Sequence, residues 1–271
     1  MSSVIWFAVF IQMIHYIVSR LVGWNVNLNL IEVCQSLLKL LGLSFLDFYL
    51  DALVLYAILF SFWKIGMQYF VSIRMKILLW RYRNKTLSVA MNKRFNTEKK
   101  DIIVVSYPET IAITMGLFNP KIVISTALIN LLNEQELNAV IFHEMYHKNQ
   151  NDPFKLFLLS LFASTMPYIP VLKWFEQQYR IIEELSADAW AIEKQQTPLN
   201  IGSALIKMLK IKKINAMPFT YVSFAETSIN YRIEYLLNPL MDTQFKIPAK
   251  IAVISCVSFC VICILCIYAA V

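Results

Sequence analysis

Apolar residues along this chain gather into long uninterrupted blocks instead of alternating with polar ones. Three blocks, over residues 1–23, 47–70 and 249–271, are long enough to cross about 30 Å of hydrocarbon as helices of roughly 20 residues. Residues 24–46 separate the first two blocks and form an amphipathic segment, for which a short extra span is the alternative. The pattern therefore predicts a multi-pass membrane protein with three transmembrane helices.

The composition supports this prediction. Hydrophobic residues make up 58% of the 271 residues, and charged residues only 16%, whereas soluble domains carry about 25% charged residues. The net charge is +7, and most of the excess follows the second apolar block. That basic segment is opposed only by Glu98 and contains Arg74, Lys76, Arg81, Arg83, Lys85, Lys93, Arg94, Lys99 and Lys100.

The basic segment fixes the expected orientation of the chain. Lysine and arginine concentrate on the cytoplasmic side of membrane proteins, so residues 71–248 are predicted to form a cytoplasmic body, with residues 24–46 on the opposite side. Contact with anionic lipid is compatible with this placement. A nucleic-acid site would need basic and aromatic residues arranged in a recognition motif, and without one we predict no direct nucleic-acid contact.

Short elements precede the chemically informative part of the body. Residues 102–106, 111–115 and 121–125 are rich in β-branched residues and separated by proline and glycine, which is typical of short strands. Asn133 with Glu136 three residues later matches a helix-capping pattern. A helix is therefore expected to begin at Asn133 and to continue into the next motif.

Residues 143–147 read His-Glu-Met-Tyr-His. On a helix, residues four apart share one face, so His143 and His147 can bind one tetrahedral zinc ion. Glu144 is then placed to take a proton from the attacking water. By chance, this five-residue pattern occurs in on the order of one in a hundred chains of this length. We therefore predict a hydrolytic zinc site.

Catalytic zinc needs a third protein ligand and an open position. The remaining histidine, His15, lies in the first predicted span, so a carboxylate is expected instead. Glu184 is assigned as this ligand, with Glu183 as the alternative. Asp188 follows Glu184 by four residues, on the same helix face, and is predicted to orient a ligating imidazole.

A fourth apolar block, residues 154–175, lies between the two halves of this ligand set. If it crossed the membrane, His147 and Glu184 would lie on opposite sides and could not share one ion. Pro167 and Pro170 interrupt the block, and proline disfavours a continuous helix. We therefore predict a membrane-dipping hairpin over about 153–178, which turns at the prolines.

Four segments resemble the BlaR/MecR-type membrane metallopeptidases, the antirepressor proteases of β-lactam resistance signalling. They are residues 116–125 (GLFNPKIVIS), 132–137 (LNEQEL), 143–148 (HEMYHK) and 184–188 (ELSAD). The resemblance implies a zinc-dependent endopeptidase with two histidine ligands, one glutamate ligand and Glu144 as general base. The expected fold is an α-helical membrane protein with a cytoplasmic α+β gluzincin-like zinc metallopeptidase domain.

The resemblance is limited to the catalytic part. Sensor members of that family carry a penicillin-binding domain after the last span, and no Ser-x-x-Lys motif follows residues 249–271 here. We therefore do not expect direct antibiotic sensing. Expected partners are a protein substrate, with a BlaI-like repressor or the chain itself as candidates, membrane lipid and a second copy of the chain. The alternatives are an HtpX- or CAAX-type quality-control or processing protease, and an inactive signalling scaffold.

Two further features of the active site remain hypotheses. Gluzincin-like chemistry uses a tyrosine, histidine or arginine to stabilise the transition state. Arg180, four residues before Glu184, is the candidate for this role, with Tyr179, Tyr231 and Arg232 as alternatives. The strand at 111–115 is a candidate edge for binding an extended substrate by strand addition.

Overall fold

The computed structural model describes the chain in eight stretches: residues 2–23, 30–40, 42, 45, 47–97, 100–212, 225–238 and 246–270. The chain divides into two compact units. The first unit comprises residues 1–69, 159–176 and 246–271, and the second comprises residues 70–158 and 177–245. Three helices, α3, α7 and α8, contain a boundary between these units.

Helices occupy the described parts of all three predicted spans. They are α1 (Ser2–Val22), α3 (Asp47–Arg81) and α11 (Ala249–Ala270). Between the first two lies α2 (Leu30–Leu40), whose 11 residues are too few to cross a bilayer as a helix. Among the described residues, α3 has the length and apolar composition needed to cross a membrane.

The third helix is longer than the apolar block that predicted it. The block ends at residue 70, but α3 continues without a break to Arg81. Its last turns contain Arg74 and Lys76, which have good helix propensity. The change from apolar to basic residues therefore marks the predicted passage from membrane to cytoplasm, and the helix continues through it.

Polar contacts tie the helices of the first unit together. The hydroxyl of Tyr16 on α1 donates a hydrogen bond to Asp51 on α3. Gln35 on α2 donates to the Tyr16 hydroxyl (2.7 Å) and to Asp51 Oδ1 (2.8 Å). Further along α3, the Lys64 ammonium donates to the carbonyl (2.6 Å) and hydroxyl (3.0 Å) of Ser160 and to the Ser164 hydroxyl.

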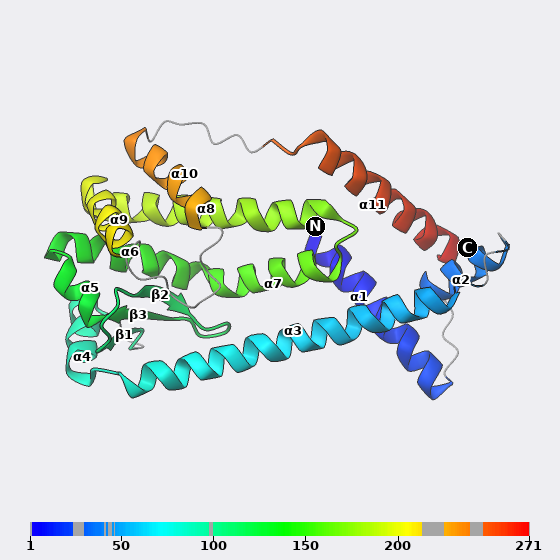
Figure 1. The fold of residues 1–271 in the computed structure, drawn as a ribbon, viewed down its shortest axis with the longest axis horizontal. Coiled ribbons are helices and arrows are strands. Elements are labelled where there is room, and N and C mark those ends of the chain that lie inside the picture. The colour runs from blue at the N-terminus through cyan, green and yellow to red at the C-terminus, as the bar shows by residue number, and fades with distance from the viewer. Residues whose placement is uncertain are drawn as a thin grey trace. The chain divides into compact units, whose positions relative to one another are not determined.

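The fourth apolar block forms two helices with a sharp turn between them (Figure 1). Helix α7 (Asp152–Thr165) ends just before Pro167, and α8 (Pro170–Gln195) begins at Pro170. Proline is favoured in the first turn of a helix, because its missing N–H would have no partner there. The turn thus lies at the predicted prolines, and the entry of the hairpin into a membrane stays a prediction.

The second unit contains a three-stranded sheet. Strands β1 (Ile102–Val105), β2 (Ala112–Met115) and β3 (Lys121–Ser125) confirm the three predicted strands, the first two being one residue shorter than expected. Their order is β1-β3-β2. Strand β3 pairs in parallel with β1 and antiparallel with β2, so β2 lies at an edge of the sheet.

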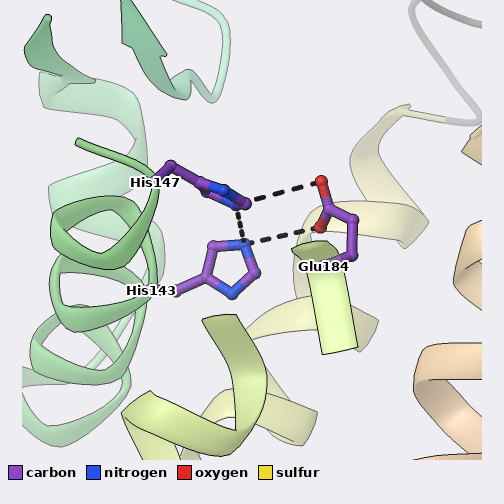
Figure 2. Close-up of side chains that lie close together, drawn as sticks. All are labelled: His143, His147 and Glu184. Carbon is purple, nitrogen blue, oxygen red and sulfur yellow. Dashed lines mark hydrogen bonds and ion pairs between the residues drawn. The ribbon is translucent and has the colours of Figure 1, made fainter. Parts of the chain in front are cut away.

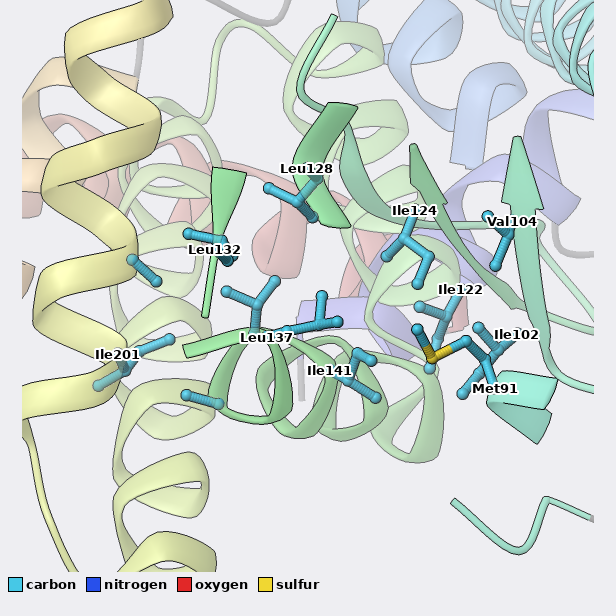
Figure 3. Close-up of a cluster of buried hydrophobic side chains, with 13 residues drawn as sticks. Met91, Ile102, Val104, Ile122, Ile124, Leu128, Leu132, Leu137, Ile141 and Ile201 are labelled. Atoms are coloured by element: carbon cyan, nitrogen blue, oxygen red, sulfur yellow. The ribbon is translucent and has the colours of Figure 1, made fainter. Parts of the chain in front are cut away.

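Helices pack around this sheet and form a buried core (Figure 3). They are α4 (Lys85–Arg94), α5 (Thr126–Leu131), α6 (Glu134–Gln150), α9 (Leu199–Lys212) and α10 (Ala225–Leu237). Ile122 and Ile124 of β3 meet Ile141 of α6 in this core, and all three are fully buried. This packing fixes α6, which carries the His-Glu-x-x-His motif, against the sheet.

Candidate metal centre

The two motif histidines lie together on α6. The helix starts as predicted: Asn133 accepts a hydrogen bond from the N–H of Glu136 (2.8 Å), and the Glu136 carboxylate accepts one from the N–H of Asn133 (2.9 Å). Further along this helix, His143 and His147 are buried, and their Nε2 atoms are 3.1 Å apart. Both rings therefore present a nitrogen to the same point.

Helix α8 brings the predicted carboxylate to this point (Figure 2). Glu184 Oε2 lies 3.4 Å from His143 Nε2, and Glu184 Oε1 lies 4.0 Å from His147 Nε2. The ligand atoms of these three residues all lie within 4.8 Å of one another. The structure thus brings together the residues predicted as ligands, in an arrangement that can hold a metal ion.

Each imidazole also has a carboxylate at its other nitrogen. Asp188 Oδ1 lies 2.8 Å from His143 Nδ1, and Asp152 Oδ2 lies 2.9 Å from His147 Nδ1. Such partners fix the orientation of a ligating imidazole and increase its basicity. Asp188 therefore occupies the position expected from the sequence, whereas Asp152 was not among the predicted site residues.

The position of Asp152 follows from the end of α6. Asn151 caps this helix in a left-handed conformation (φ 54°), which turns the chain so that the next residue starts α7. Asn is one of the few residues that adopt this conformation readily. On the other side, the Tyr179 hydroxyl donates to Asp152 Oδ1 (3.0 Å). An aspartate directly after an asparagine cap is the signal that could have identified this residue.

Arg232 on α10 joins the two acids of α8. Its Nε and Nη2 atoms donate to Asp188 Oδ2 (2.7 Å) and Oδ1 (2.8 Å), and its Nη1 donates to Glu184 Oε2 (2.8 Å). The Arg232 side chain is only 12% exposed, and Asp188 is fully buried. The guanidinium thus offsets the repulsion between the buried carboxylate of Asp188 and the half-buried carboxylate of Glu184.

Glu144 lies beside the edge strand of the sheet. It is buried, and the Thr114 hydroxyl on β2 lies 2.7 Å from its Oε2 and 2.9 Å from its backbone carbonyl oxygen. A hydroxyl carries one hydrogen, so it donates to one of these oxygens at a time. This contact holds the carboxylate against β2.

The charges of the centre shift its pKa values. Burial and the positive charge of Arg232 lower the pKa of His143, but Asp188 and Glu184 outweigh them and raise it to about 9. Burial raises the pKa of Glu184, but Arg232 and His143 hold it well below its ordinary value. The two acids therefore favour the protonated form of His143, and a proton on this ring competes with metal binding.

Comparison with known proteins identifies the family of this chain. The BlaR1 peptidase M56 family matches residues 46–236, more than two thirds of the chain. The chain belongs to the M56 peptidase family. The match includes the helices that carry the two histidines, Glu184 and Arg232, and it confirms the family resemblance stated from the sequence motifs.

A curated relative of this M56 family member is Protease HtpX homolog 2 from Sulfurisphaera tokodaii. The two proteins are 30% identical over 96 residues. That segment makes up 35% of this chain and 29% of the relative. The chain therefore matches less than a third of the length of this relative.

Glu183, Arg180 and Tyr231 complete the set of predicted site residues. Glu183, the alternative third ligand, forms a second group with His147 and Asp152, whose ligand atoms also lie within 4.8 Å of one another. This group does not include His143. The burial of Glu183, with the neighbouring charges of Glu184 and Asp152, raises its pKa to about 9. The positive charge of Arg180 acts on Glu183. A transition-state role for Arg180 therefore stays a prediction, as does one for Tyr231.

Proposed function

We propose that this chain is a membrane-embedded zinc metalloendopeptidase whose catalytic body lies in the cytoplasm. The observation that carries the proposal is the convergence of His143 Nε2, His147 Nε2 and the Glu184 carboxylate on one point. Zinc bonds to nitrogen and oxygen of about 2.0–2.1 Å place tetrahedral ligands about 3.3 Å apart. The two Nε2 atoms are 3.1 Å apart, and the two oxygens of Glu184 lie 3.4 Å (Oε2 to His143) and 4.0 Å (Oε1 to His147) from them, so the carboxylate is close enough to share one ion with both rings.

The proposed roles follow from these contacts. When bound, zinc supplies Lewis acidity, which polarises a water molecule and the carbonyl of the scissile peptide. Glu144 accepts the proton of the attacking water and passes it to the leaving amine, and Thr114 holds its carboxylate. Asp188 and Asp152 keep the rings of His143 and His147 oriented.

In this proposal, an extended substrate binds along strand β2. It lies at the edge of the sheet, and it contains Thr114, which contacts Glu144. An extended peptide that pairs with β2 as an additional strand would therefore lie along the same edge as the proposed base.

The proposed substrate is a regulatory protein, either a repressor-like protein or the chain itself. Membership of the BlaR1 peptidase M56 family supports this choice. The similarity to Protease HtpX homolog 2 supports a second candidate, quality control or processing of membrane proteins. Incubation of the purified protein with a BlaI-like repressor and with a misfolded membrane protein would separate the two candidates, since each predicts cleavage of only one.

The metal and the chemistry can be tested separately. Elemental analysis of the purified wild-type protein should give one zinc per chain, which is lost in His147→Ala. Glu144→Gln should keep the zinc but lose peptide cleavage by about 10²–10⁴-fold, because it removes the general base. A metal-free wild-type protein, or cleavage by Glu144→Gln at the wild-type rate, would contradict the proposal.

The membrane orientation needs its own measurement. The basic residues between Arg74 and Lys100 support a cytoplasmic body. In a variant whose five native cysteines are replaced, single cysteines introduced at exposed Leu199 and at exposed Leu40 should react differently with a membrane-impermeant reagent applied to intact cells. Labelling of residue 199 from outside the cell would refute the orientation.

A further inference from the structure

Arg232 contacts a proposed metal ligand and the residue behind another ligand. Its Nη1 donates to Glu184 Oε2 (2.8 Å), while its Nε and Nη2 form a two-bond contact with Asp188. Asp188 in turn contacts His143 Nδ1 (2.8 Å). One guanidinium thus bridges the side chains of the third ligand and the orienting aspartate, which α8 places one turn apart.

The contact also distinguishes the two oxygens of Glu184. Oε2 lies 3.4 Å from His143 Nε2 and also accepts the hydrogen bond of Arg232, whereas Oε1 lies 4.0 Å from His147 Nε2 and has no contact with Arg232 among the hydrogen bonds of the described residues. An oxygen that accepts a charged hydrogen bond at 2.8 Å has less electron density to offer a cation. A metal ion should therefore bond to Oε1 and leave Oε2 on Arg232.

Ligation through one oxygen has a chemical consequence. Two imidazoles and one carboxylate oxygen occupy three positions of a tetrahedral ion and leave the fourth open for water. If both oxygens of Glu184 were bound, the protein would supply four ligand atoms, and a bound water would make the ion five-coordinate. The restraint on Oε2 therefore favours four ligands in total, with one position left for water.

We propose that Arg232 is a positioning residue of the metal centre, which holds Glu184 in single-oxygen ligation and keeps Asp188 behind His143. This inference rests on the proposed function, because it assumes that the centre binds zinc. The planar fork of arginine makes parallel bonds to a carboxylate, which the compact ammonium of lysine cannot reproduce. Arg232→Lys should therefore keep the positive charge but lose the restraint.

The first test uses Arg232→Lys and Arg232→Gln in the full-length protein. Both should bind zinc about 10–100-fold more weakly than wild type in competition with a chelator, as expected for loss of an outer-shell partner. With cobalt in place of zinc, both should show weaker visible absorption than wild type, because a higher coordination number lowers its intensity. Wild-type affinity and an unchanged cobalt spectrum in both variants would overturn the proposal.

A matched control separates positioning from stability. Lys207 on α9 donates to buried Glu136 (2.7 Å), so Lys207→Gln also removes the cation of a buried carboxylate in the second unit. This variant should lower the melting temperature of the metal-free protein without changing zinc affinity or the cobalt spectrum. If Lys207→Gln changes both metal readouts as much as Arg232→Lys does, Arg232 acts only through general stability.

A measurement on the wild-type protein needs no variant. X-ray absorption of the zinc-loaded protein should show four nitrogen or oxygen ligands, and a fifth from a second Glu184 oxygen would overturn the proposal even if zinc is bound. Failure of the wild-type protein to bind zinc at all would instead overturn the proposed function. The two failures are therefore distinguishable.

Discussion

Asp152 offers a direct test of the proposed metal centre. Its Oδ2 lies 2.9 Å from Nδ1 of His147, and both residues are buried. Asp152→Ala removes this partner, which should weaken zinc binding by about 10–100-fold. This corresponds to roughly 1.4–2.8 kcal/mol, at about 1.4 kcal/mol for each tenfold change.

A graded series makes the test sharper. Asp152→Asn keeps an oxygen that can accept the N–H of His147 but removes the charge. Hydrogen bonds to charged groups contribute about 1.5–3 kcal/mol, compared with about 1 kcal/mol for neutral ones. Asp152→Asn should therefore lose roughly 1 kcal/mol of zinc-binding free energy, or about fivefold in zinc affinity. Its affinity should lie between those of wild type and Asp152→Ala.

The assay is competition between the purified protein and a fluorescent zinc chelator at constant pH. Asp101→Asn is the control, because Asp101 is another buried carboxylate of the second unit and pairs with Lys121 and Lys148. It should leave zinc affinity unchanged. If Asp152→Ala binds zinc within twofold of wild type, the reasoning about the outer partner of His147 is wrong.

Three further predictions concern the stability of the protein and the contacts between its helices. Asn133→Ala removes the cap of α6 and should lower the free energy of unfolding by about 0.5–2 kcal/mol in denaturant titrations. Burial raises the pKa of Glu136, but Lys207 and Ser203 outweigh it and hold the pKa below its ordinary value of 4.5. The contribution of the charged Glu136 to the free energy of unfolding is therefore complete above about pH 4.5 and is lost as the pH falls through the lowered pKa. Glu136→Gln removes this contribution, so its melting temperature should decline less than that of wild type between roughly pH 5 and pH 3. Lys64→Met removes the hydrogen bonds to α7 and should lower the detergent melting temperature, while Lys39→Met, at an exposed lysine of α2, should not.

Local patterns predicted the parts of the centre that lie on single helices. The spacing of His143 and His147, and the capping box at Asn133, depend only on helix geometry, and both are present in the structure. The turn between α7 and α8 was predictable because proline restricts the backbone at Pro167 and Pro170.

Contacts that depend on tertiary structure were harder to predict. Arg232 lies 44 residues after Asp188 in the sequence, and its bonds form only where the tertiary structure brings α10 within reach of α8. The sequence suggested Arg232 as an alternative transition-state stabiliser, whereas the structure shows it bonded to the two acids. The end of α3 at Arg81 could not be predicted from the apolar pattern, because the basic residues after position 70 favour helix as well as the apolar ones do.

The joint between α6 and α7 has a consequence for insertions and deletions. Asp152 reaches His147 because a single left-handed residue, Asn151, separates the two helices. One residue added there would turn the start of α7 by about 100°, since a helix advances 3.6 residues per turn. Such an insertion would leave all three proposed ligands in the sequence and still remove the support of one imidazole. The length of this junction is therefore as restricted as the identity of the ligands.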